Sequence, residues 1–326
     1  NELTIRRKYI KSLWRTHNLF KLNIKQLTLY LCYFMLSFTA FSLNRNSEKI
    51  GTYLYGVTID DSWDYNSTNI SKIVKALKNM PVKPVARIVM SYDVSPEEYR
   101  DLFKEVNKVA YIMATPVDSS EMKKYRNVES YLRRFRKSYA VLSEYVDIWE
   151  IGNEVNGENW LGKNPQLIAD KVYAAYNFIH KEKNSSTALT SYYFSPGNQK
   201  ISMDEWLIKY IPNDMKKNLD YVLVSYYEDD NEGFQPDWKN VFQKLKNIFP
   251  NSKLGIGECG NSDSKATAES KIKMINHYYR MPRYTKNYIG GYFWWYWVQD
   301  AVFQKDGYKI QNEINKSINY TNMNLK

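Results

Sequence analysis

The feature that most constrains the fold is a regular alternation of apolar runs and helical patterns from Gly51 onward. Such alternation is typical of repeated βα units around a parallel sheet. The apolar runs span residues 52–59, 85–91, 110–117, 148–154, 187–194, 220–227, 253–259 and 288–297. The helical patterns span residues 69–80, 96–109, 128–146, 165–183, 203–217, 238–249, 266–280 and 309–320. Eight βα units, each with a right-handed crossover, predict a closed (β/α)8 TIM barrel.

An open, doubly wound α/β sheet is the alternative fold that this alternation permits. Nucleotide-binding sheets of that kind carry a Gly-rich loop after the first strand. No such loop follows residues 52–59. We therefore expect residues 44–326 to form one barrel-shaped catalytic domain.

The chain before this domain consists of a basic stretch, residues 1–26, and an uncharged apolar segment, residues 27–43. The apolar segment is at the short end of the about 17 to 25 residues that span a bilayer, and it slightly exceeds a signal-peptide core. We interpret it as a hydrophobic helix acting as a signal anchor or a signal peptide, with a buried core helix as the alternative. The positive-inside rule keeps residues 1–26 cytoplasmic. The domain is then extracytoplasmic, either membrane-anchored or secreted.

Charge and residue usage exclude several classes of function. The basic stretch holds seven Lys and Arg against one acid, so it supplies +6 of the net charge of +11. The remaining charge is too diffuse for a nucleic-acid footprint. With only Cys32 and Cys259, a disulfide framework is not expected. The histidines, His17, His180 and His277, lie in the basic stretch or in helical patterns, which argues against a zinc site or a Ser-His-Asp triad. No metal or other cofactor is expected.

Candidate functional residues stand near the ends of the expected strands, because active sites of barrels form at the carboxyl ends of their strands. Residues 148–154 end in Asn153 and Glu154, and residues 253–259 carry Glu258. Elsewhere the expected strands carry Arg87, Ser225, Tyr226, Tyr227, Trp295 and Trp297. Glu150 lies deeper in the fourth strand, where we expect a buried structural partner for an arginine.

Two carboxyl groups that face each other across a barrel mouth suit glycoside hydrolysis. One protonates the leaving oxygen, while the other, ionised, attacks the anomeric carbon or activates water. Strands four and seven lie on roughly opposite sides of an eight-stranded barrel, so Glu154 and Glu258 are predicted to flank a bond between them. A gap of about 5 Å between the carboxyl groups would give retention, and one above about 6.5 Å would give inversion.

The motifs WEIGNE (149–154) and GIGE (255–258) resemble those of strands four and seven in the clan A glycoside hydrolases, a superfamily of retaining (β/α)8 enzymes. The resemblance implies that Glu154 is the acid/base and Glu258 the nucleophile. It matches Asn153 to the asparagine that holds the sugar 2-hydroxyl, and Arg87 to the strand-two arginine near the nucleophile. It matches Tyr227 to the tyrosine that hydrogen-bonds the nucleophile.

The segment GGYFWWYW (290–297) resembles the strand-eight segment of these hydrolases, in which a tryptophan forms the floor of the sugar-binding subsite. Trp295 is the best match, and Trp297 falls on the same face of the expected strand. One departure concerns strand six, where many of these families carry His-x-Tyr and this chain has Ser225-Tyr226-Tyr227. The resemblance therefore identifies the clan and not a family within it.

The sequence predicts a retaining glycoside hydrolase that cleaves a β-linked oligo- or polysaccharide by double displacement. The alternatives are a membrane-tethered barrel that binds glycans without cleaving them, and a transglycosylase. For Glu154 to donate a proton near neutral pH, its pKa must be raised while Glu258 stays ionised.

Overall fold

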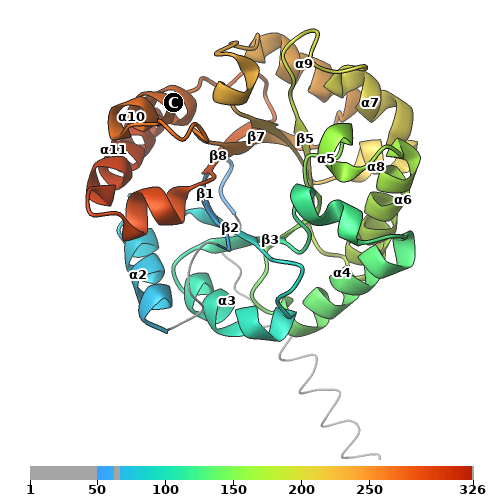
Figure 1. Ribbon diagram of the computed structural model, residues 1–326, viewed down its shortest axis with the longest axis horizontal. Helices are drawn as coiled ribbons and strands as arrows, with labels where there is room; N and C mark the ends of the chain where they lie inside the picture. Colours follow the sequence, from blue (N-terminus) through green and yellow to red (C-terminus); the bar gives the residue numbers. More distant parts are fainter. Residues whose placement is uncertain (1–49, 62–66, 325–326) are drawn as a thin grey trace, which may run out of the picture. The chain divides into compact units, whose positions relative to one another are not determined.

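Eight parallel strands close into a barrel in which the strand order follows the sequence from β1 to β8 (Figure 1). The computed structural model describes residues 50–61 and 67–324. The strands are β1 (Leu54–Ile59), β2 (Val85–Val89), β3 (Tyr111–Thr115), β4 (Ile148–Gly152), β5 (Thr187–Tyr192), β6 (Tyr221–Tyr226), β7 (Lys253–Cys259) and β8 (Tyr288–Trp294). This confirms the predicted (β/α)8 barrel.

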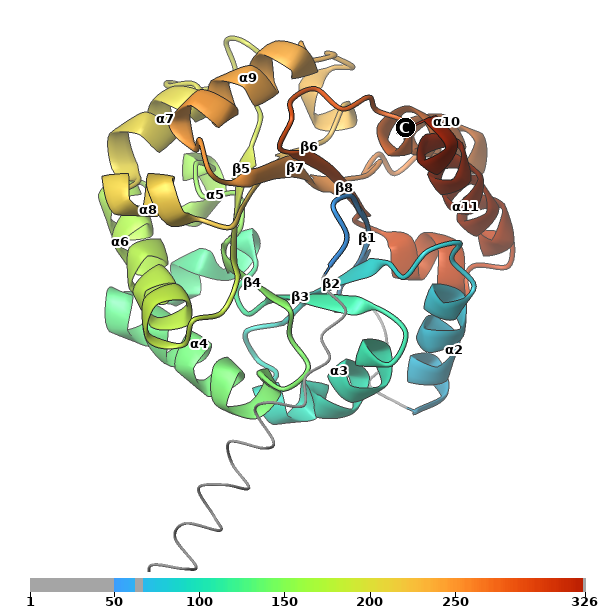
Figure 2. The same cartoon turned by 180° about the vertical axis from the view of Figure 1, so that it is seen from behind.

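Most of the helices surround the strands as an outer ring, which the views from the two ends of the barrel show (Figure 1, Figure 2). The helices of the described residues are α2 (Ser67–Lys78), α3 (Arg100–Asn107), α4 (Val128–Leu142), α5 (Glu158–Leu161), α6 (Pro165–Tyr176), α7 (Met203–Tyr210), α8 (Asn213–Asn218), α9 (Trp238–Ile248), α10 (Ala268–Tyr279) and α11 (Gly307–Asn324). Shorter helical segments are η1 (Pro96–Tyr99), η2 (Ser119–Lys124), η3 (Asn177–Glu182), η4 (Asp229–Asn231) and η5 (Val298–Phe303).

The helix expected at residues 203–217 is divided into α7 and α8. Pro212 lies between them and cannot continue a helix, because it lacks the backbone N–H and its ring clashes with the preceding turn. Ile211, just before it, accordingly has an extended backbone, with φ −80° and ψ 128°.

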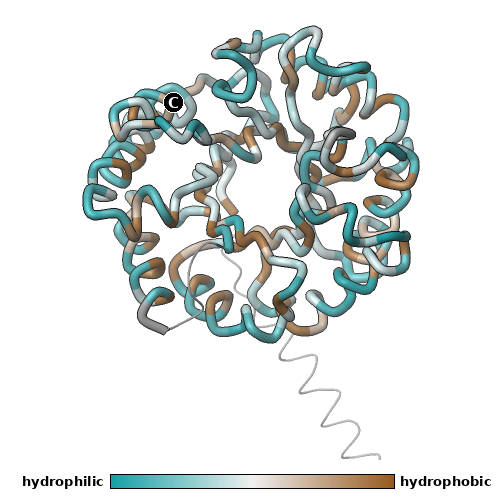
Figure 3. Tube along the Cα trace, viewed as in Figure 1, coloured by the Kyte–Doolittle hydropathy of each residue, from teal (hydrophilic) through white to brown (hydrophobic). Residues whose placement is uncertain are grey.

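The hydrophobic core lies between the strands and the surrounding helices. Successive strand residues point to opposite faces of a sheet, so Arg87 and Glu150, which bond to each other across the barrel, place their chain neighbours on the helix side. Ala86, Ile88 and Ile151 on that side belong to the buried hydrophobic core. Figure 3 shows the same division, with hydrophobic residues on the strands and inner helix faces and hydrophilic residues outside. The barrel interior is therefore free to hold polar groups.

Two strands end earlier than the sequence pattern predicts. β4 stops at Gly152, two residues before Glu154, and β8 stops at Trp294, three residues before Trp297. At Gly152 a side chain does not fit, because a Cβ atom would lie 2.7 Å from a methyl carbon of Val155. The backbone turns there, and Glu154 takes a left-handed conformation with φ 49°.

The residues from Gly51 onward form one compact unit. Among the residues that the structure describes, no helix is both long and apolar enough to cross a membrane. The predicted basic stretch, residues 1–26, and the predicted anchor or signal peptide, residues 27–43, lie outside the described residues.

Candidate active site

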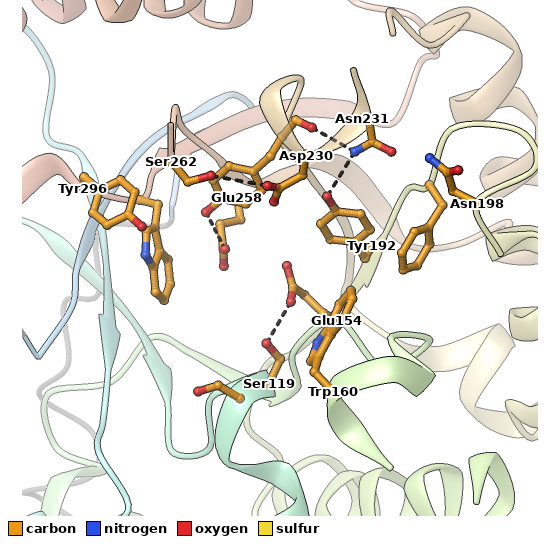
Figure 4. Close-up of a pocket in the computed structure, with 14 residues that line it drawn as sticks. Ser119, Glu154, Trp160, Tyr192, Asn198, Asp230, Asn231, Glu258, Ser262 and Tyr296 are labelled. Atoms are coloured by element: carbon orange, nitrogen blue, oxygen red, sulfur yellow. Dashed lines mark hydrogen bonds between the residues drawn. The ribbon is translucent and has the colours of Figure 1, made fainter. Parts of the chain in front are cut away.

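Glu154 and Glu258 line the same cavity, of about 600 Å³. Glu154 follows β4 and Glu258 belongs to β7, so elements far apart in the sequence bring the two carboxyl groups together. Figure 4 shows both side chains pointing into the space between them. Both are buried, with exposed fractions of 7% and 4%. The cavity therefore presents two carboxyl groups to whatever occupies it.

Two neutral hydroxyl groups hold the carboxyl group of Glu154. Ser119 donates to its Oε2 at 2.8 Å, and Ser225 donates to its Oε1 at 2.6 Å. Burial raises the pKa of Glu154 to about 7, and the two hydroxyl hydrogen bonds oppose this rise only in part. Ser225 stands where the resembled families carry histidine, so a hydroxyl group contacts the candidate acid/base at this position. Ser119, in η2, had no recognisable signal in the sequence.

Glu258 has a cationic partner. Nη1 of Arg87 donates to its Oε2 at 2.8 Å, and the Tyr227 hydroxyl donates to its Oε1 at 2.6 Å. Burial raises the pKa of Glu258, while the Arg87 guanidinium and the Tyr227 hydroxyl act in the opposite direction. The two glutamates interact electrostatically, so they titrate as a pair. The guanidinium bonds Glu258 and not Glu154, so it favours the ionised form of Glu258 more than that of Glu154.

A buried polar layer below the cavity fixes Arg87. Its Nε donates to Oε2 of Glu150 at 2.9 Å, and both side chains are fully buried. The hydroxyl groups of Thr115 and Thr190 also donate to Glu150. This confirms Glu150 as a buried structural partner of an arginine. The layer holds the guanidinium with one nitrogen directed at Glu258.

Asn153 lies beside Glu154 and is 1% exposed. Its Nδ2 donates to Oδ1 of Asp118 at 3.0 Å, while its own Oδ1 has no hydrogen-bond partner among the described residues. Asp118 lies just before η2, in a loop to which the sequence pattern gave no role. The contact orients the Asn153 amide, whose unpartnered carbonyl oxygen is buried beside Glu154.

The two tryptophans expected to share one face of strand eight are in different environments. Trp295 lines the cavity, and its ring centre lies 5.5 Å from Cζ of Arg87. Trp297 is fully buried, and its indole N–H donates to Gln311 of α11 at 2.9 Å. The expected placement of Trp297 beside Trp295 is wrong, because β8 ends at Trp294 and the alternation of strand faces ends with it. Trp297 packs beneath α11, away from the cavity lining.

An aromatic wall, made by Trp160, Tyr192 and Phe194, closes the side of the cavity next to Glu154. The ring centres of Tyr192 and Phe194 are 4.6 Å apart, and those of Trp160 and Tyr192 are 5.4 Å apart. The sequence pattern did not single out these three residues: Trp160 lies in α5, beyond the end of β4, and Tyr192 and Phe194 lie at the end of the run 187–194, to which no role was given. Aromatic rings of this kind offer flat apolar surfaces on which sugar rings stack.

In the described part of the chain, no group of three or more His, Cys, Asp and Glu side chains is placed to hold a metal ion.

No protein-family model matches this sequence, and no curated protein matches it either. Solved structures do match. The family 1 β-glucosidase from Thermotoga maritima superposes with a TM-score of 0.55 at 12% identity, over 82% of this chain and 98% of that one. Gas2p of Saccharomyces cerevisiae, in complex with laminaritriose and laminaritetraose, has a TM-score of 0.54 at 11% identity, over 81% of this chain and 64% of that one.

The likeness to these two structures confirms the barrel fold that the resemblance of the sequence motifs implied. At these identities the likeness shows a shared barrel architecture. It does not identify a family within the clan.

Proposed function

We propose that this chain is a retaining glycoside hydrolase that cleaves a β-linked glycan by double displacement. The observation that carries the proposal is the unlike pair of carboxyl groups in one cavity, Glu154 among neutral hydroxyls and Glu258 against a guanidinium. Unlike environments separate the pKa values of two carboxyl groups, which is what an acid and a nucleophile require. The fold of the similar glycosidases agrees with this chemistry.

In the first step, an ionised oxygen of Glu258 attacks the anomeric carbon. The bond from that carbon to the glycosidic oxygen breaks, and the proton of Glu154 passes to the leaving oxygen. The products are a glycosyl ester of Glu258, an ionised Glu154 and the released aglycone. The Tyr227 hydroxyl and Arg87 hold Glu258 in place for this attack, since both bond its oxygens in the resting site.

In the second step, Glu154 removes a proton from water, and the water oxygen attacks the anomeric carbon. The ester bond breaks, Glu258 leaves as a carboxylate, and the released sugar keeps its original anomeric configuration. Esterification removes the negative charge of Glu258, one of the groups that raise the pKa of Glu154 in the coupled pair. The pKa of Glu154 therefore falls in the intermediate, which suits its role as a base.

Two further residues contribute to sugar binding in this proposal. The free carbonyl oxygen of Asn153 accepts a hydrogen bond from a sugar hydroxyl, and the ring of Trp295 forms an apolar floor. Arg87 acts through Glu258. Trp297 has no part in binding, because its side chain is fully buried under α11.

Trapping with 2-fluoro glycosides that carry activated leaving groups, followed by peptide mapping, tests the proposal directly. We expect a covalent label on Glu258, and the sugar that labels fastest identifies the preferred glycone. A label on any other residue contradicts the assigned roles. NMR of the first-formed anomer distinguishes retention from inversion, and product sizing distinguishes hydrolysis from transfer.

Release of reducing sugar separates an enzyme from a barrel that only binds glycans. The panel includes laminari-oligosaccharides, because one structural neighbour was solved with them. We expect release by the wild type and none by Glu258→Gln. Equal background release from the two proteins favours a glycan-binding protein.

The extracytoplasmic location is also a proposal, and it rests on the apolar segment at residues 27–43 behind the basic stretch. Protease treatment of intact cells tests it. We expect the domain to be digested while a cytoplasmic marker is protected. Protection of both contradicts the proposed location.

A further inference from the structure

A second cavity, of about 700 Å³, adjoins the catalytic cavity. The two cavities share Trp160, Phe194 and Asn198 in their linings. In Figure 4, Trp160 and Asn198 stand on the side of Glu154, away from Tyr296. The second cavity therefore lies beyond the aromatic wall, on the Glu154 side of the site.

Lysines from three loop regions line this second cavity. Lys123 comes from η2, Lys163 from the segment before α6, and Lys200 from the segment after β5. All three side chains are exposed, and none of them forms an ion pair or a side-chain hydrogen bond within the described residues. Its lining includes no Asp or Glu among the residues whose side chains are described. We call this cavity the lysine pocket.

Some lysines of the barrel are ion-paired, unlike the three that line the lysine pocket. Lys124, next to Lys123 in sequence, pairs with Glu121 at 3.1 Å, and Lys244 pairs with Asp204 at 2.9 Å. Where positive charges converge on a concave surface without nearby acids, the field is focused and attracts an anion.

The position of the lysine pocket relative to the two glutamates sets which part of a glycan reaches it. In a retaining mechanism the nucleophile contacts the anomeric carbon and the acid contacts the leaving oxygen. The leaving sugar therefore extends from Glu258 past Glu154. Trp160 and Asn198 lie on that side of Glu154 (Figure 4), and because both also line the lysine pocket, that pocket lies on the leaving-group side of the site.

We propose that the lysine pocket binds an anionic group on the leaving-group side of the glycan, either the carboxylate of a uronic acid or a sulfate ester. The inference deepens the proposed function and rests on it, because it takes Glu154 as the residue beside the leaving oxygen. The substrate class is then an acidic β-linked glycan rather than a neutral one.

Binding to a catalytically silenced protein tests the inference without requiring turnover. The full chain carrying Glu258→Gln is titrated calorimetrically with laminaritetraose and cellotetraose. Each is used in three forms: neutral, oxidised to carboxylates at C6 of the two reducing-end sugars, and sulfated at the same positions. We expect at least one acidic form to bind about 10-fold more tightly than the neutral form at low salt, and this advantage to shrink as salt screens the charges.

Charge-matched variants locate the effect. Lys123→Gln, Lys163→Gln and Lys200→Gln are combined in one protein. The control combines Lys75→Gln, Lys78→Gln and Lys104→Gln, which remove three exposed lysines of α2 and α3 outside the cavity linings. We expect the first variant to lose the 10-fold preference and the control to keep it within about twofold, since a diffuse change of net charge acts on both proteins equally.

Failure of this inference and failure of the proposed hydrolase function give different results. The inference is overturned if neither acidic form of laminaritetraose or cellotetraose binds more tightly than the neutral form. It is also overturned if the control variant loses the preference as fully as the lysine-pocket variant does. Cleavage of neutral glycans would then still support the hydrolase. Conversely, lysine-dependent binding of an acidic form supports the inference even where the wild type releases no sugar, in which case only the hydrolase proposal fails. The carboxylate and sulfate forms separate the two sources of charge.

Discussion

The β4 side and the β7 side of the barrel mouth present the same functional group in different ways. On the β4 side, Glu154 stands on a turn after the strand and receives hydrogen bonds from two serines. On the β7 side, Glu258 lies within the strand itself and meets a fully buried arginine. Burial without a cationic hydrogen-bond partner favours the neutral form of Glu154, although the two serines oppose this in part, whereas the guanidinium favours the carboxylate form of Glu258.

The difference shows how one residue type is divided between two roles. Desolvation acts on both glutamates, so burial alone does not distinguish them. What distinguishes them is the buried layer of Arg87 and Glu150, which delivers a guanidinium to one side only. The predictions below test this asymmetry, beginning with the largest effect.

Removing the acid and removing the nucleophile should affect different substrates. For Glu154→Gln we expect cleavage of glycans with sugar leaving groups to fall by about 10² to 10⁴, the range that general acid catalysis contributes. The first step with a 2,4-dinitrophenyl glycoside should survive, because that leaving group needs no proton. Glu258→Gln should cleave neither the glycans nor the dinitrophenyl glycoside, because it lacks the nucleophile. Stopped-flow measurement of the dinitrophenolate burst provides the comparison, and an equal loss of both substrates in the two variants would contradict the assigned roles.

Removing the cation should destabilise the β7 side strongly. Arg87→Met leaves Glu150 and Glu258 buried without a counterion, which typically costs about 3 to 5 kcal/mol of unfolding free energy. The control is Arg280→Met, since Arg280 pairs with Glu313 at 3.0 Å in a partly exposed position. Pairs near the surface contribute about 0 to 1 kcal/mol. Urea unfolding of both variants measures the difference. Equal losses would show that Glu258 does not depend on the guanidinium.

Removing the titratable group on the β4 side should stabilise the protein above neutral pH. The pKa of Glu154 is raised from 4.5 to about 7, so the folded state binds this proton more tightly than the unfolded state does. The stability contributed by the proton is complete below the unfolded pKa and is lost as the pH rises through the folded pKa. At about 1.4 kcal/mol per pKa unit, Glu154→Gln should be about 3 kcal/mol more stable than the wild type at pH 8, and nearly equal at pH 4.

Glu205 offers a control of the opposite sign. It caps α7 by accepting hydrogen bonds from Ser202, and its pKa is lowered in the folded state. Glu205→Gln should therefore lower stability at neutral pH and lose this effect in acid. Denaturant titrations at several pH values test both variants. No gain for Glu154→Gln above pH 7 would mean that burial does not hold a proton on that side.

The fold and the reacting pair were predictable from the sequence because both depend on local patterns. Alternating apolar runs fix the order of strands and helices, and barrel closure then places the ends of β4 and β7 around one mouth. Arg87 and Tyr227 were matched through short strand motifs, and the structure places both against Glu258.

The residues that the sequence did not reveal lie where local patterns end. Ser119 and Asp118 belong to the connection after β3, and Trp160 to the short helix α5, whose positions depend on how the loops pack across the barrel mouth. Trp297 was misplaced for a related reason. The alternation of side chains along a strand predicts that Trp297 faces the same way as Trp295. The chain instead leaves β8 after Trp294 and enters η5, so the Trp297 side chain lies under α11.

The smallest expected effect concerns Ser225, which distinguishes this site from the histidine-bearing pattern. Its hydrogen bond lowers the pKa of Glu154 in part, so Ser225→Ala should raise that pKa further. Because protonated Glu154 is the active acid, the basic limb of the kcat/KM profile should begin near pH 7 in the wild type and move to higher pH in the variant. Ser191→Ala is the matched control, since Ser191 is a buried β5 serine whose hydroxyl has no hydrogen-bond partner among the described residues. It should leave the limb in place. A limb that stays fixed in Ser225→Ala, or that moves to lower pH, would show that the serine does not tune the acid, and the contrast between the two sides would then rest on Arg87 alone.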